Sequence, residues 1–126
     1  MPESSAGSLD RSAALKAAGI GLAGQLAMVF GGNVNADIAQ MFPTLGTTIA
    51  GVAGLLYPLL RRGLTTKQAA GGGALAGGGG AVLGILVSYL LGDVPISVVA
   101  IGGGMSTVAG AIGGVIGRLL TAKTPA

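Results

Sequence analysis

Long uncharged, apolar stretches alternate with short polar segments along this chain. The stretches 68–92 and 94–117 contain no charged side chain, and each is longer than the roughly eighteen apolar residues that mark a membrane span. As helices, they would be about 36 Å long, against a hydrocarbon core of about 30 Å. A further uncharged stretch, 44–60, would reach about 25 Å, the short limit of a span. The pattern predicts an all-α integral membrane protein with three to four transmembrane helices.

The first apolar stretch, 17–31, is shorter again and contains Gln25. It has three interpretations: a marginal span, a helix that lies in the membrane interface, or a signal segment cleaved after the "VNA" that precedes Asp37. We expect a polar tail over 1–16 and a single membrane domain over 17–126. The helices of that domain are predicted at about 17–31, 44–60, 68–92 and 95–120.

Charged residues are scarce and lie outside the apolar stretches. They make up 9% of the chain, and the mean hydropathy is +0.80, whereas soluble domains carry about 25% charged residues. If the first stretch crosses the membrane, all seven Lys and Arg residues fall on one side. Because cytoplasmic loops are enriched in Lys and Arg, this favours four crossings with both chain ends inside. The residues expected to set the topology are Arg61, Arg62, Lys67, Arg118 and Lys123.

Small residues recur at every fourth position in the last two predicted spans. An interior Gly costs roughly 0.5–1 kcal/mol relative to Ala in a water-exposed helix, but helices in lipid associate through close approach of small-residue faces. The spacing predicts helical hairpins with small-xxx-small packing faces, and more such surface than one bundle needs, which favours a homo-oligomer. Replacing Gly80 or Gly110 by Leu is expected to weaken assembly while leaving insertion intact. The predicted helix-packing residues are Gly72, Ala76, Gly80, Gly84, Ser88, Gly102, Ser106, Gly110 and Gly114.

The composition argues against catalysis and ligand chemistry. The chain has no Cys and no His, so thiolate and imidazole groups are missing as nucleophiles, bases and metal ligands. No predicted span carries a charged residue near its centre, and the glycine runs lack the Lys-Ser/Thr of a phosphate loop. We therefore expect no enzyme activity, no metal or other cofactor, no nucleic-acid partner and no small-molecule substrate. The expected partners are further copies of the chain and the lipid bilayer.

A few uncharged polar side chains remain within the predicted spans. Ser and Thr in helices commonly return a hydrogen bond to their own helix; the alternative is that Ser88, Ser106 and Thr107 face a lumen. Gln25 is expected to hydrogen-bond across a helix interface, because an amide in lipid needs a partner. The alternative for Gln25 is a position near a water-filled end.

The order of these features resembles that of phage holins. The matching segments are the basic turn "LLRRGLTTK", the tight turn "GDVP" and the last span with its basic tail, "IGRLLTAKTPA". The resemblance implies a protein that accumulates in the bacterial inner membrane, oligomerises and opens lesions in host cell lysis, with the small faces of the last two spans as contact surfaces. The alternatives are a non-catalytic membrane scaffold and a membrane subunit of a virion or of a larger complex.

Overall fold

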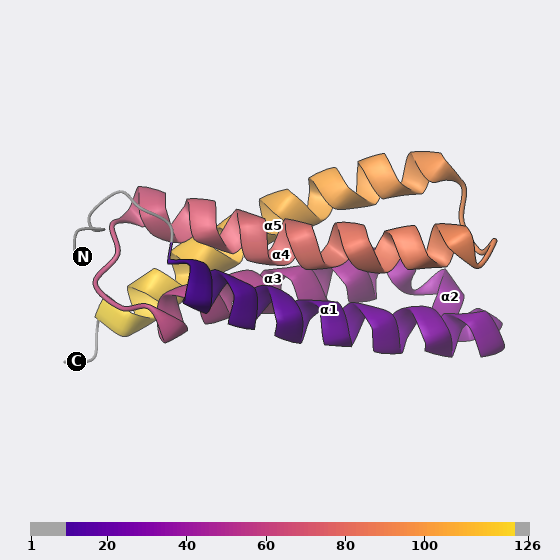
Figure 1. The fold of residues 1–126 in the computed structure, drawn as a ribbon, viewed down its shortest axis with the longest axis horizontal. Helices are drawn as coiled ribbons and strands as arrows, with labels where there is room; N and C mark the ends of the chain where they lie inside the picture. The colour runs from indigo at the N-terminus through magenta and orange to yellow at the C-terminus, as the bar shows by residue number, and fades with distance from the viewer. Residues whose placement is uncertain (1–9, 123–126) are drawn as a thin grey trace.

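Residues 10–122 are described by a computed structural model, and they form an antiparallel bundle of four long helices with one short helix at one end (Figure 1). The two ends of the described chain lie together at the end of the bundle opposite the short helix. The helices are α1 (Arg11–Val34), α2 (Ala36–Gln40), α3 (Phe42–Leu60), α4 (Thr66–Leu90) and α5 (Ile96–Ala122).

The prediction of an all-α fold with membrane character is confirmed. Within residues 10–122, three helices are long and apolar enough to cross a membrane, and a shorter apolar helix accompanies them. The order of lengths differs from the expectation, because the first helix qualifies by length whereas the apolar part of α3 is the shorter one. The qualifying segments are Arg11–Val34, Thr66–Leu90 and Ile96–Thr121, and the shorter one is Thr44–Leu60.

Helix α1 begins at Arg11, six residues before the expected start at residue 17. The reason is a side-chain cap: Oδ1 of Asp10 accepts a hydrogen bond from the backbone N of Ala13 at 3.0 Å, which satisfies one of the free N–H groups of the first turn. The capped helix has 24 residues. A charged side chain at Lys16 interrupts the apolar pattern without interrupting the helix.

The turns between the long helices are short and chemically specified. Thr65 caps α4 by accepting from the backbone N of Gln68 at 3.1 Å, and the Gln68 side chain accepts from the backbone N of Thr65 at 2.9 Å, which is a capping box. Gly63 and Gly92 both have φ of +82°, a left-handed conformation that only glycine adopts at little cost. These two turns reverse the chain before α4 and before α5.

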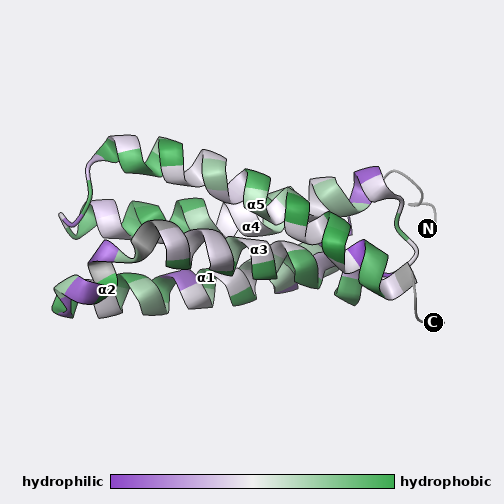
Figure 2. Ribbon diagram, turned by 180° about the vertical axis from the view of Figure 1, so that it is seen from behind, coloured by the Kyte–Doolittle hydropathy of each residue, from purple (hydrophilic) through white to green (hydrophobic). Residues whose placement is uncertain are grey.

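The outer surface of the bundle is apolar along its length. Figure 2 shows hydrophobic residues along all four long helices, with hydrophilic residues mostly towards the two ends. Large side chains point outward, including Leu15 at 72% exposure, Ile101 at 63% and Val108 at 60%. In water such a surface would drive aggregation, whereas in lipid it is solvated. The fold therefore matches a bilayer as its solvent.

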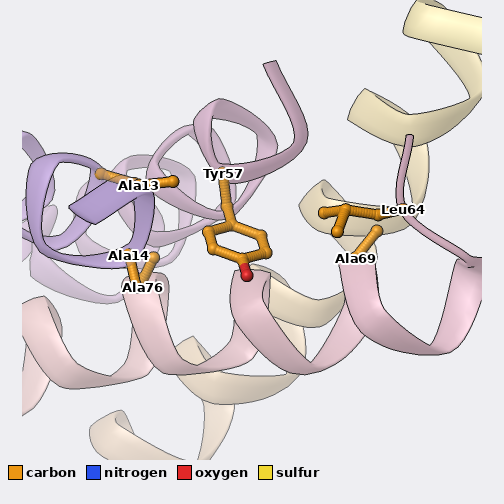
Figure 3. Close-up of a cluster of buried hydrophobic side chains, with 7 residues drawn as sticks. Ala13, Ala14, Tyr57, Leu64, Ala69 and Ala76 are labelled. Atoms are coloured by element: carbon orange, nitrogen blue, oxygen red, sulfur yellow. The ribbon is translucent and has the colours of Figure 1, made fainter. Parts of the chain in front are cut away.

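The interior is built mainly from small side chains around one large one. Figure 3 shows the Tyr57 ring among alanines of α1 and α4. Tyr57 is 1% exposed, and its Oη accepts a hydrogen bond from the backbone N of Asp10 at 3.0 Å. This contact ties α3 to the start of α1. The buried cluster comprises Ala13, Ala14, Ala17, Tyr57, Leu64, Ala69 and Ala76.

The first prediction concerns the cap at Asp10. Asp10→Ala removes the acceptor for Ala13 N and is expected to lower the free energy of unfolding in detergent by about 1 kcal/mol. Asp10→Asn keeps an acceptor oxygen and loses only the partly exposed ion pair with Arg61, whose Nε lies 3.2 Å from Oδ2; such a pair contributes less than about 1 kcal/mol. Amide hydrogen exchange at Ala13 and Ala14 reports the cap directly. Equal exchange in the two variants would contradict the capping role.

Candidate functional site

Helix α4 approaches α5 and α3 so closely that backbone meets backbone. A Cβ atom added at Gly77 would lie 2.5 Å from the carbonyl O of Ala50 on α3 and 2.8 Å from Cα of Gly110 on α5. A Cβ atom at Gly73 would lie 2.8 Å from Cα of Gly114. Real side chains do not tolerate such distances, so glycine is required here. We name the contact of Gly73 and Gly77 with Gly110 and Gly114 the glycine seam.

Helix α1 covers another side of α4 by the same means. A Cβ atom at Gly80 would lie 3.1 Å from the carbonyl O of Ala18 and from the backbone N of Leu22. One at Gly84 would lie 2.6 Å from Cβ of Gln25. Close approach of backbones is how helices gain dispersion and weak Cα–H···O contacts in lipid. Helix α4 is therefore packed against α1, α3 and α5.

Every predicted helix-packing residue is buried except Gly102, which is half-buried near Ile85. Their contacts lie between helices of one copy. The proposed substitutions at Gly80 and Gly110 therefore disturb the fold of a single copy before they bear on assembly. Sequence reasoning missed further close contacts, although their spacing of four was visible in the chain. The missed glycines at this spacing include Gly73, Gly77, Gly113 and Gly117.

Some glycines remain open on the outside. Within the described chain, nothing lies within 4 Å of a Cβ atom added at Gly71 or Gly79 of α4, or at Gly19 of α1. Gly71 and Gly79 lie in a shallow groove along α4 beside α5, which we name the outer groove. Its lining residues are Gly71, Ala74, Leu75, Gly78, Gly79, Val82, Leu83 and Thr107.

Gln25 links α1 to α3 inside the bundle. The residue is 1% exposed, and its Nε2 donates to the carbonyl O of Gly46 at 3.0 Å, which confirms the expected bond across a helix interface. Its Oε1 has no hydrogen-bond partner among the described residues, and neither has the Oγ of Ser88, which is also 1% exposed. Two buried polar atoms are thus left unsatisfied at one level of the bundle.

Both atoms belong to residues that line a cavity of about 330 Å³ between the helices. Ser106 lines it as well, whereas Thr107 lies in the outer groove and donates to its own helix at the carbonyl O of Gly103, at 2.7 Å. We name this space the polar cavity. Its lining residues are Gln25, Met28, Val29, Gln40, Gly46, Thr47, Ile85, Ser88, Val94, Val98 and Ser106.

The basic side chains of the described residues gather at one end, where Asp10 pairs with Arg61, and the two other described acidic residues lie at the opposite end. The acidic end, where α2 lies, carries Asp37 and Asp93; both side-chain oxygens of Asp93 accept from Nδ2 of Asn33, at 2.9 and 3.1 Å. At the opposite, basic end, Nε of Arg118 donates to the carbonyl O of Leu64 at 3.0 Å. The predicted topology residue Lys123 lies outside the described residues. Near the basic end are Arg11, Lys16, Arg61, Arg62, Lys67 and Arg118.

Comparison with protein-family models, curated proteins and solved structures finds no match to this chain. The glycine seam, the outer groove, the polar cavity and the two charged ends are therefore the features from which a function is inferred.

The second prediction compares two glycines on one helix. Gly77→Ala places a methyl group against Ala50 and Gly110, and it is expected to lower the free energy of unfolding by about 1–3 kcal/mol through overpacking. Gly79→Ala makes the same chemical change two residues away, where a methyl group meets open space, and it should leave stability unchanged or raise it. Unfolding in mixed detergent micelles, followed by far-UV circular dichroism, measures both. Equal stability of the two variants would contradict the seam.

Proposed function

We propose that this protein inserts into the bacterial inner membrane, self-associates and permeabilises that membrane, as a holin-like protein of phage lysis. The observation that carries the proposal is the closure of a single copy. Backbones touch near the middle of the bundle, at Gly77, Ala50 and Gly110, and this contact blocks a passage through one bundle. A passage for solutes then has to form between copies, by lateral assembly.

The charge distribution supports an orientation for this assembly. Lys and Arg on loops near membrane spans favour the cytoplasmic side. The basic end would therefore face the cytoplasm, and the acidic end with Asp37 and Asp93 would face outward. In this placement we propose four crossings, with α3 as the shortest, and both ends of the described chain on the cytoplasmic side.

The outer groove is the surface we propose for contact between copies. Close packing of helices in lipid uses small residues, and most glycines of α4 are already occupied within the bundle. Gly71 and Gly79 are the ones that stay open, and they face outward beside Leu75 and Leu83. A helix of a second copy can approach α4 there as α5 approaches it at the glycine seam.

A second candidate function is a non-catalytic membrane subunit or scaffold. The observation that favours it is that the predicted packing residues make their contacts within one copy. A compact bundle with an apolar surface can also be a permanent subunit of a larger membrane complex. Leakage of an encapsulated dye from liposomes that contain the purified protein distinguishes the two, because only a permeabilising protein releases the dye.

The third prediction tests permeabilisation in cells. Inducible expression in a bacterium should produce an abrupt, delayed loss of membrane potential, followed with a potential-sensitive dye. Gly79→Leu should delay or abolish that loss and reduce cross-linked oligomers, because the side chain fills the outer groove. Gly19→Leu is the matched control, since it also adds a leucine at an open glycine, on α1, and it should behave as wild type.

The outcomes separate the function from the interface. A stable potential at high membrane abundance of the wild-type protein would overturn permeabilisation and favour the subunit. Depolarisation by Gly79→Leu with wild-type timing and oligomer size would retain permeabilisation and reject the outer groove as the contact between copies.

A further inference from the structure

We propose that the polar cavity is a water-filled vestibule that opens at the acidic end and stops near the middle of the bundle. The inference rests on the membrane placement in the proposed function, and it does not require that the protein permeabilises the membrane. Its ligand is water, together with small water-soluble molecules that enter with water.

The unsatisfied polar atoms are the first observation behind this inference. Gln25 Oε1 and Ser88 Oγ are buried without a partner in the described part of the chain. Leaving such a group unpaired is energetically costly, and buried polar atoms without protein partners are commonly satisfied by water. Gln25 Nε2 is engaged by Gly46, so Oε1 is the atom that needs a donor. Water supplies one, and the Ser88 hydroxyl can both donate to water and accept from it.

The size and chemistry of the cavity are the second observation. Its volume is about 330 Å³, and a water molecule in the liquid occupies about 30 Å³, so several waters fit. Most of the wall is apolar, and its polar groups come from Gln40, Thr47 and Ser106 in addition to Gln25 and Ser88. A water needs two to four polar partners to be held in a protein interior. Waters bound to each other and to these side chains reach that number.

The position of the lining residues indicates where water enters. Gln40 ends α2, and Val94 lies in the turn before α5, so both belong to the acidic end. Figures 1 and 2 show α5 diverging from α4 towards this end. The first residues of α5 are correspondingly little covered, with Ile96 56% exposed. The mouth of the vestibule therefore lies at the acidic end, on the outer side in the proposed orientation.

The floor of the vestibule is closed by the packing already described. From Ser88 along α4 towards the basic end, Gly84 lies against Gln25 and Gly80 lies against the α1 backbone. Ala81, one turn further towards the glycine seam than Ile85, is 1% exposed. Backbone contacts leave no room for a chain of waters through this part of the bundle. Water thus reaches Ser88 and Ser106 and stops there.

The fourth prediction uses cysteine labelling, for which the chain is suited because it has no cysteine. Single variants Ser88→Cys and Ser106→Cys are placed in liposomes with the acidic end outward and treated with a small, membrane-impermeant methanethiosulfonate. Thiols react as thiolates, which form in water and not in lipid or in a dry core. Both variants should react about tenfold or more faster than the two controls. The controls are Ala81→Cys, buried on the same helix, and Ile101→Cys, exposed on the apolar outer surface.

A thermal unfolding transition like that of the wild type establishes that each variant is folded, and a serine-to-cysteine change alters volume little. Labelling of Ser88→Cys and Ser106→Cys at the slow rate of Ala81→Cys would overturn the vestibule. Dye leakage is measured on the same liposomes. Fast labelling without leakage retains the vestibule and rejects permeabilisation, whereas leakage without fast labelling rejects the vestibule alone.

Discussion

Contact between backbones at the glycine seam is the interaction on which the rest of the bundle depends. Lipid provides no hydrophobic force between apolar helices, so association relies on dispersion and weak hydrogen bonds, which need close approach. At Gly73, Gly77 and Gly110 no side chain separates the helices. This approach brings Ala50 of α3 to the same point and leaves the opposite side of α4 free for α1. Larger residues at the seam would move every other interface outward.

The sequence predicted the helical class and the use of small residues, but not the partners of those residues. Spacing of four identifies a small-residue face on α4 and on α5. A small face that packs within one copy is chemically the same as one that packs against a second copy, so spacing does not tell which partner the face has. Gln25 was predictable because a lone amide in an apolar stretch has few ways to be satisfied. The start of α1 was not predictable from the apolar pattern, because the charged Lys16 limits the uncharged stretch at its N-terminal side. Asp10 starts the helix through the geometry of its side-chain cap, which the pattern does not reveal. The polar cavity was hidden because its wall combines residues from all the helices.

The separation of charge gives the bundle a direction that its apolar surface lacks. Basic side chains and both ends of the described chain lie together, while Asp37 and Asp93 lie at the other end with the mouth of the polar cavity. Loop charges act through membrane insertion and not through packing, so they can be placed without disturbing the seam. In the proposed orientation, loop charges set the direction of the bundle and glycines set its packing, although Arg118 and Asp93 also hydrogen-bond within the fold.

The divergence of α5 from α4 towards the acidic end (Figure 1) follows from where small side chains occur along α4. Its first half is rich in glycine and alanine, and there the neighbouring helices approach to backbone contact. In the second half of α4, α1 still packs closely at Gly80 and Gly84, whereas towards α5 the side chain of Ile85 takes the place of backbone contact and lies against Gly102. Helix α5 reinforces this gradient, because Gly113 and Gly117 pack near the basic end whereas branched side chains such as Val98 occur near its start. Between the seam and the acidic end, the divergence of α5 leaves the polar cavity, and Gln25 and Ser88, whose side-chain oxygens have no partner among the described residues, line it. A second cavity, of about 320 Å³, lies at the basic end beside Arg61 and Arg118. The glycine contacts thus lie between two hollows, one at each end of the bundle.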